Sequence, residues 1–313
     1  MKRTTDISTA VAHLKNHELV AFPTETVYGL GGDGCDDQVV AKIYAAKGRP
    51  QFNPLIVHVA SLETAQGLAQ FNPLALKLAE KFWPGPLTIV VPRLPDCPVS
   101  LLASAGLDSL AIRVPAHPLA QALLQEYGGP LVAPSANPSG AISPTSADHV
   151  IAGLEGKIDM VLDGGECEVG VESTIVSCLD DVPVILRHGG VPRSDIEALL
   201  VMKVADGTEN AKAPTAPGQL ASHYAPKASV RLNVSEPAPN EAYLGFGSLA
   251  VEPLLNLSTK GDLVEAAANL FKMLHQLDRR GVEKIAVSPI PDHGLGEAIN
   301  DRLRRAAAPR ETG

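Results

Sequence analysis

The stretch 87–133 decides the fold, because it contains L-T-I-V-V (87–91), S-L-A-I-R-V (109–114) and P-L-V-A (130–133). Each run is short and apolar and holds β-branched residues, which predicts a buried strand. A helical pattern at 117–126 separates the second run from the third. Strands that alternate with helices are typical of an α/β fold, in which helices cover a twisted sheet.

This alternation extends in both directions along the first 200 residues. Helices are predicted at 6–16, 36–46, 61–70, 73–82, 145–152 and 193–200, and strands at 19–22, 55–59, 158–162, 173–177 and 183–187. Farther on, strands at 229–233, 241–246 and 284–288 alternate with helices at 262–279 and 296–307. We therefore expect a first domain over 1–200, a linker rich in proline and small residues over 201–228, and a small α/β domain over 229–313.

Charge is unevenly distributed along the 313 residues. The formal net charge is −9, and residues 1–200 account for all of it, with 13 Lys and Arg against 22 Asp and Glu. This balance argues against a protein that binds nucleic acid through a broad basic surface. The few basic residues in loops of this part are candidates to bind small anions.

The cysteines and the hydropathy pattern indicate a cytoplasmic protein. The four cysteines have no C-x-x-C spacing and no partner histidine cluster, which argues against a disulfide scaffold or a structural zinc site. The sequence has no run of 18 apolar residues and no signal-peptide pattern, so no membrane association is expected.

Gly29, Gly31 and Gly34 match the G-x-G-x-x-G spacing of dinucleotide-binding proteins. That motif requires its glycines directly at a strand end, with the amides of a helix N-terminus free for pyrophosphate. Here the predicted strand ends at Phe22, and Asp33 places a carboxylate in the loop. We therefore reject this interpretation, and the sequence has no P-loop motif either.

Four polar loops are better candidates for binding: P-T-E-T-V-Y-G-L (23–30), A-K-G-R-P (46–50), A-P-S-A-N-P-S-G (133–140) and G-V-E-S-T-I-V (170–176). They offer hydroxyls, amides and a Lys–Arg pair that can face one anion. Ordinary surface turns and a solvated helix end are equally consistent with their spacing.

Isolated charged residues add further candidates. Arg113 lies in an apolar strand, so it requires either an anionic ligand or a salt bridge. Glu25 and Glu172 are a candidate carboxylate pair that nothing in the sequence brings together. The following histidines lack a metal-ligand pattern and are expected at the surface: His13, His17, His149, His188 and His293.

Taken together, the loops resemble the threonylcarbamoyl-AMP synthases of the Sua5/YrdC type. The matching motifs are P-T-E-T-V-Y-G-L-G (23–31), A-K-G-R-P (46–50), N-P-L-I-V-H (53–58), W-P-G-P-L-T (83–88), A-I-R-V-P (111–115), A-P-S-A-N (133–137) and V-E-S-T-I-V (171–176). The stretch A-P-G-Q-L-A-S-H-Y-A-P (216–226), followed by a small α/β domain, resembles the long form of the family.

The resemblance implies a twisted mixed sheet with helices, followed by a small Rossmann-like α/β domain. It also implies a nucleotidyltransferase that makes threonylcarbamoyl-AMP from L-threonine, bicarbonate or CO2, and ATP, with Mg2+ and with release of pyrophosphate. The product would pass to a transferase that modifies adenosine 37 of tRNA to its N6-threonylcarbamoyl form.

The resemblance further assigns site residues. Lys47 and Arg49 would be catalytic. The residues associated with ATP are Arg49, Asn53, Ser135, Asn137, Ser143, Arg187 and Tyr224, and those associated with threonine are Thr26, His58, Arg113, Ala133 and Ser173. No residue is assigned to a metal ion, and the linker that carries His223 and Tyr224 is expected to reach the site and close it.

Two other functions stay open at this point. One is an RNA-binding module of the same fold, although the acidic first domain predicts no strong direct RNA binding. The other is a related enzyme that makes a carbamoyl-adenylate from carbamoyl phosphate. Pyrophosphate release with threonine and bicarbonate would indicate a threonylcarbamoyl-AMP synthase, whereas release with carbamoyl phosphate would indicate the related enzyme.

Overall fold

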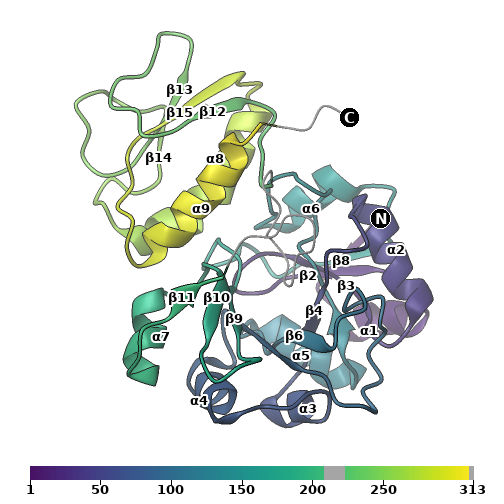
Figure 1. Ribbon diagram of the computed structural model, residues 1–313. Helices are drawn as coiled ribbons and strands as arrows, with labels where there is room; N and C mark the ends of the chain where they lie inside the picture. Colours follow the sequence, from purple (N-terminus) through teal and green to yellow (C-terminus); the bar gives the residue numbers. More distant parts are fainter. Residues whose placement is uncertain (208–222, 310–313) are drawn as a thin grey trace.

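The computed structural model describes residues 1–207 and 223–309, and these form two sheets (Figure 1). In the larger sheet the strand order is β1-β8-β2-β3-β7-β4-β6-β5-β9-β10-β11, with both parallel and antiparallel neighbours. Its strands are β1 (Lys2–Thr4), β2 (Val20–Phe22), β3 (Gly29–Asp33), β4 (Ile56–His58), β5 (Leu87–Pro92), β6 (Ser109–Arg113), β7 (Leu131–Val132), β8 (Met160–Leu162), β9 (Thr174–Ser177), β10 (Val184–Arg187) and β11 (Ala205–Asp206). The sheet is therefore mixed, as the family resemblance implies.

Helices cover the larger sheet on both faces. They are α1 (Ile7–Lys15), α2 (Asp37–Lys47), α3 (Leu62–Gln66), α4 (Pro73–Phe82), α5 (Pro118–Tyr127), α6 (Ala147–Leu154) and α7 (Arg193–Leu200). One apolar cluster joins α1 and α5 to the sheet, for example through Leu14 and Leu123. A larger cluster joins α2, α4 and α7 to it, for example through Ile43, Leu78 and Ile196.

The ends of α2 illustrate how local sequence sets an element. Asp36 caps the first turn, because its carboxylate accepts hydrogen bonds from the amides of Gln38 and Val39. The helix ends at Gly48, whose left-handed backbone (φ 61°) favours glycine. This stop sets the start of the A-K-G-R-P loop, so Lys47 closes the helix and Arg49 follows the turn.

The second sheet is parallel, in the order β12-β15-β13-β14. Its elements are β12 (Ser229–Arg231), β13 (Ala242–Gly245), β14 (Leu255–Asn256), α8 (Leu263–Arg279), β15 (Lys284–Val287) and α9 (Leu295–Ala307). A small parallel sheet with helices confirms the Rossmann-like fold class expected for this part. In Figure 1, α8 and α9 lie between this sheet and the rest of the molecule.

The two parts of the chain share one apolar cluster. Val27, Ile142 and Val171 from the first part pack with Leu270 and Phe271 of α8. His149, predicted at the surface, is in fact buried, because its ring stacks on that of His275 in α8 with the centroids 3.8 Å apart. The sequence gives no sign of this burial, since the covering helix lies more than 100 residues away along the chain.

Most predicted elements are confirmed, and 73–82 and 193–200 match α4 and α7 exactly in extent. The glycine-rich segment is the main error: the sequence predicts a loop there, but Gly29–Asp33 is strand β3, antiparallel to β2. Glycine is disfavoured in strands, yet a Cβ on Gly31 would lie 2.7 Å from the ring of Phe22, and one on Gly32 would lie 2.5 Å from Val39. The glycines therefore allow close packing, and the rejection of a dinucleotide motif is consistent with their position in a strand.

Smaller differences concern short elements. Strands β1, β11 and β14 were not predicted, and the helix expected at 61–70 spans only Leu62–Gln66. Strand β11 pairs with β10 inside the segment predicted as linker. All four cysteines are free thiols. Among the described residues, none of the helices has the length and apolar character needed to cross a bilayer.

Candidate active site

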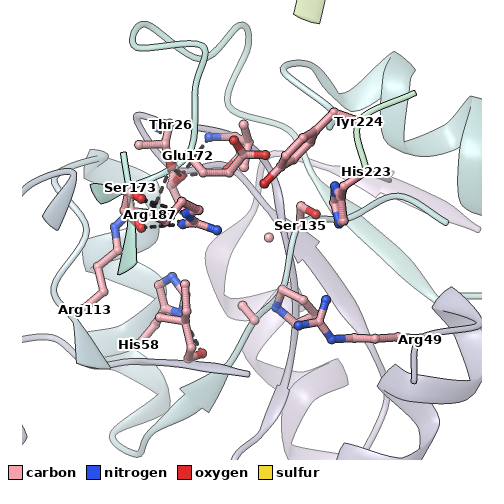
Figure 2. A pocket seen from close by; sticks show the side chains of 16 residues that line it. Thr26, Arg49, His58, Arg113, Ser135, Glu172, Ser173, Arg187, His223 and Tyr224 are labelled. Carbon is pink, nitrogen blue, oxygen red and sulfur yellow. Dashed lines mark hydrogen bonds between the residues drawn. The ribbon is translucent and has the colours of Figure 1, made fainter. Parts of the chain in front are cut away.

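A pocket opens where the ends of strands from the larger sheet meet the segment that follows residue 222 (Figure 2). The following described residues line it: Thr24, Thr26, Val27, Gly29, Arg49, Ile56, His58, Arg113, Ala133, Pro134, Ser135, Glu172, Ser173, Arg187, His223 and Tyr224. All four polar loops singled out in the sequence contribute, so segments spread over about 150 positions of the chain converge on one cavity.

Arg113 is buried on one side of the pocket and has a carboxylate partner. Its guanidinium donates to Glu25 Oε1 at 2.6 Å, to Thr26 Oγ1 at 2.9 Å and to the carbonyl of Gly85 at 3.3 Å. The sequence left open whether Arg113 binds an anionic ligand or forms a salt bridge. The structure shows a salt bridge to Glu25, and Arg113 also lines the pocket. These bonds use three of its five N–H donors, which leaves one N–H on each terminal nitrogen for a ligand.

His58 is held as a neutral ring on the same side. Burial, reinforced by the charge of Arg113, lowers the pKa of His58 to about 3. Its Nδ1 lies 3.2 Å from the carbonyl of Ile56, which can only accept, so Nδ1 carries the proton. Nε2 is therefore a hydrogen-bond acceptor.

Ser173 connects two strands at the back of the pocket. Its hydroxyl lies 2.7 Å from that of Thr88 and accepts a hydrogen bond from Arg187 at 3.0 Å. Arg187 also donates twice to the carbonyl of Ser173, at 2.9 and 3.1 Å. Burial lowers the pKa of the Arg187 guanidinium, as expected for a cation withdrawn from water.

The other side of the pocket carries a second arginine. Arg49 donates to the side-chain oxygen of Asn53 at 2.6 Å and to the carbonyls of Asn53 and Pro54 at 3.2 and 2.9 Å. All of these acceptors are neutral, and burial lowers the pKa of Arg49 to about 10. Tyr44 beneath it donates to the carbonyl of Asn53, which fixes the loop.

Lys47 is buried behind the pocket and is not one of its lining residues. Its ammonium donates to the carbonyls of Ser135 and Asn137, so it shapes the A-P-S-A-N loop from below. Burial and the charge of Arg49 hold the pKa of Lys47 well below its usual range. Asn53, Asn137 and Ser143 also lie behind the lining, next to residues that form it.

Glu25 and Glu172 do not form a pair, since each carboxylate has an arginine of its own. Glu172 lines the pocket, accepts from Ser143 Oγ at 2.5 Å and accepts from Arg302 Nε at 2.7 Å. Burial opposes its ionisation, but Arg302, Arg187 and Ser143 outweigh this and lower the pKa of Glu172.

His223 and Tyr224 line the pocket on the same side as Glu172, and Figure 2 shows the Tyr224 ring beside that carboxylate. Both are buried, and the buried Nδ1 of His223 has no hydrogen-bond partner among the described residues. Burial and four surrounding cations hold the pKa of His223 well below its usual range. The rest of the expected linker motif, residues 216–222, lies outside the described residues.

Comparison with known proteins adds independent information. A family model described as "Telomere recombination" matches residues 12–189, and one described as "Threonylcarbamoyl-AMP synthase, C-terminal domain" matches residues 191–308. Threonylcarbamoyl-AMP synthases from Bacillus subtilis and Pyrococcus abyssi are each 40% identical to this chain over 97% of its length, covering 93% and 94% of those proteins.

The chain belongs to the threonylcarbamoyl-AMP synthases. The crystal structure of P. abyssi Sua5 complexed with L-threonine is 38% identical and superposes with a TM-score of 0.88, covering 98% of this chain and 96% of that one. The recognition made from the loop motifs and the expected enzyme class are thereby confirmed. As a threonylcarbamoyl-AMP synthase of the two-part form, the protein is a nucleotidyltransferase and not a stand-alone RNA-binding module.

The sequence motifs of this threonylcarbamoyl-AMP synthase predicted much of the lining of the pocket. Nine of the predicted site residues line it: Thr26, Arg49, His58, Arg113, Ala133, Ser135, Ser173, Arg187 and Tyr224. Thr24, Val27 and Ile56 also line it, and they lie inside the quoted motifs, although no individual role is predicted for them. Arg302 contacts Glu172 from α9, within the stretch G-L-G-E-A-I-N-D-R-L-R-R-A (294–306), which resembles the C-terminal domain of the family. No role is predicted for Arg302 from the sequence.

Proposed function

We propose that the pocket binds L-threonine against Arg113 and ATP against Arg49 and Arg187, and that it joins them through a carbamate. The observation that supports this most directly is the distribution of charge. Arg113 already has a carboxylate partner, whereas Arg49 is hydrogen-bonded to neutral oxygens. The first side suits a ligand that carries both a cation and an anion, and the second suits a polyanion.

Threonine would be recognised by the residues named from the resemblance. The remaining N–H donors of Arg113 would bind its carboxylate, with the backbone at Ala133 beside it. Nε2 of His58 would accept a hydrogen bond from the threonine hydroxyl, and the hydroxyls of Thr26 and Ser173 would complete this shell. A site that hydrogen-bonds a hydroxyl strongly disfavours an analogue without one.

ATP would lie against Arg49 and extend to Arg187, which lies beside Ser173 and near the charges of both Arg49 and Arg113. Ser135 lines this side, and Asn137 and Ser143 lie behind it. Asn53 would act by holding the guanidinium of Arg49 through its side-chain oxygen. Tyr224 and His223 would cover the nucleotide. Lys47 would act through the A-P-S-A-N loop, whose two carbonyls it holds.

The chemistry requires no protein nucleophile. The neutral threonine amine adds to CO2 and loses a proton, which gives the carbamate. A carbamate oxygen then attacks the α-phosphorus of ATP in line, and the bond to the departing pyrophosphate breaks. Arg49 and Arg187 would stabilise the charge that develops on the phosphoryl oxygens, so catalysis is mainly positioning and electrostatics.

Mg2+ would arrive with ATP and not occupy a protein site of its own. Among the described residues there is no group of three or more His, Cys, Asp or Glu able to hold a metal ion. Glu172 is the acidic residue among the described residues that line the pocket. Both of its carboxylate oxygens already accept hydrogen bonds, one from Ser143 and one from Arg302. The residues present do not form a cage for the ion, whereas phosphate oxygens are typical Mg2+ ligands.

We also propose that the enzyme works in the cytosol and passes its product to the transferase that modifies tRNA. Four free thiols favour a reducing compartment. The acidic first part of the chain favours product transfer without strong direct binding of RNA.

One assay tests the substrates. Pyrophosphate release is measured with ATP and either threonine plus bicarbonate or carbamoyl phosphate. We expect release that depends on both threonine and bicarbonate. Release supported by carbamoyl phosphate alone would contradict the proposal.

A further inference from the structure

We propose that Arg302 of α9 is a positioning residue of the active site, which neutralises Glu172 and seats Tyr224, so that the second part of the chain completes the wall that binds ATP. This inference rests on the proposed binding of ATP in the pocket. It gives α8 and α9 a role in the reaction that goes beyond joining two domains.

Arg302 is a fully buried side chain that reaches out of its own domain. Its Nε donates to Glu172 Oε2 at 2.7 Å, and a terminal nitrogen donates to the carbonyl of His188 at 2.9 Å. The other terminal nitrogen donates to Asp301 in the same helix at 2.6 Å. An arginine with no exposed side-chain surface and three directed contacts is fixed in one geometry.

The partner of Arg302 lies where a carboxylate would harm the reaction. Glu172 lines the pocket beside Arg187, and an unpaired carboxylate there would repel the phosphates of ATP in a low-dielectric setting. Arg302 cancels this charge from behind, and Ser143 holds the other carboxylate oxygen.

The same guanidinium lies against Tyr224. Its central carbon is 5.0 Å from the centre of the Tyr224 ring, whose other neighbours are Phe271 of α8 at 5.6 Å and His223 at 4.0 Å. The amide of His223 donates to the carbonyl of Arg305, one turn along α9. Helix α9 therefore contacts both residues that cover the pocket, and Arg302 is the link between them and Glu172.

Charged and titratable groups from several elements surround Glu172, and Asp301 of α9 contacts Arg302 from the far side. Arg302 approaches from α9, Arg187 from β10, Tyr224 from the segment after 222, and Lys47 from α2. Without Arg302, the pKa of Glu172 would rise, because burial is then opposed by fewer positive charges. Lower pH would protonate the carboxyl and remove the repulsion.

The test is a double-mutant cycle with Arg302→Met and Glu172→Gln, measured as KM for ATP, KM for threonine and kcat. Arg302→Met should raise KM for ATP at least tenfold, with a smaller change in KM for threonine, and the defect should shrink between pH 8 and pH 6. In the Glu172→Gln background the same substitution should cost less than threefold. Arg304→Met, an exposed arginine of the same helix, should behave like the wild type.

Each outcome has a defined meaning. If Arg302→Met raises KM for ATP equally in both backgrounds, or has no effect on it, the proposal is wrong. If Arg302→Met does not fold, the double variant decides, because it lacks the buried unpaired charge: ATP binding close to wild type supports charge balance, and loss of ATP binding overturns it. Direct titration of ATP into the wild-type protein distinguishes a failure of the Arg302 proposal from a failure of the proposed function. If the wild type does not bind ATP, the assignment of the pocket to ATP is itself wrong.

Discussion

The two sides of the pocket are built in different ways. The Arg113 side comes from strands and loops of a single sheet, and its charge is balanced inside the fold by Glu25. The Arg49 side carries buried cations held by neutral oxygens, and it is completed by His223, Tyr224 and α9. Under the proposed assignment, the site for the small zwitterion would be completed within one domain, whereas the site for the polyanion would need the second one.

The largest effect is expected for Arg113→Met, which tests the role of the Arg113 side. We expect kcat/KM for threonine to fall at least about 100-fold, because a charge-assisted two-pronged contact is lost, while the affinity for ATP changes little. Removing one partner of a buried pair also destabilises the fold by about 3–5 kcal/mol. Steady-state kinetics and thermal unfolding measure the two effects.

A matched variant separates these effects. Glu25→Gln/Arg113→Met removes both charges of the buried pair, so it should recover stability without recovering the use of threonine. Recovery of threonine turnover in this double variant would show that Arg113 serves the fold alone.

On the opposite side, Arg49→Met should lower ATP-dependent turnover at least tenfold, which corresponds to about 1.4 kcal/mol of transition-state stabilisation. The threonine affinity, measured without ATP, should stay within threefold of the wild type. Lys42→Met is the control, because Lys42 is an exposed residue of helix α2 that donates to the carbonyl of His17 at the surface. An equal loss in the two variants would mean that the effect of Arg49 is not specific to the site.

The smallest effect is expected where the second domain meets the first, at the stacked His149 and His275. Burial lowers the pKa of His149 to about 3 and that of His275 to about 4, below the ordinary value near 6.5. Between pH 6.5 and pH 4 the unfolded chain therefore binds protons that the native one does not, so stability falls as the pH falls.

His275→Gln tests this, since a glutamine amide can still donate to the carbonyl of Ser143 that His275 Nε2 contacts at 3.1 Å. The loss of Tm between pH 7 and pH 5 should be smaller in the variant than in the wild type. If the loss of Tm between pH 7 and pH 5 is the same in the variant and the wild type, His275 is not a source of the acid sensitivity.

The elements that could be predicted from the sequence are those whose ends are set by nearby residues. The Asn72–Pro73 cap fixed the start of α4, and Gly48 fixed the end of α2, because both act within one turn of the chain. Strand β3 escaped prediction, because its glycines were selected by packing against Phe22 and not by strand propensity.

The site shows the same limit at longer range. Motifs predicted the lining, since ligand-binding loops carry distinctive residue types at fixed spacing. His149 and Arg302 were not predictable, because each is defined by a partner more than 100 residues away, and no local pattern in α6 or α9 encodes that contact.

The apolar cluster that joins the two sheets has a consequence for how the chain unfolds. Val27, Ile142 and Val171 contribute to the same core as Leu270 and Phe271, so neither part can lose its partner without exposing apolar surface to water. We therefore expect the two parts of the chain, which are distinct in topology, to unfold as one cooperative unit. Heating or denaturant would therefore melt the pocket and the parallel sheet together, and catalytic activity reports on the integrity of both.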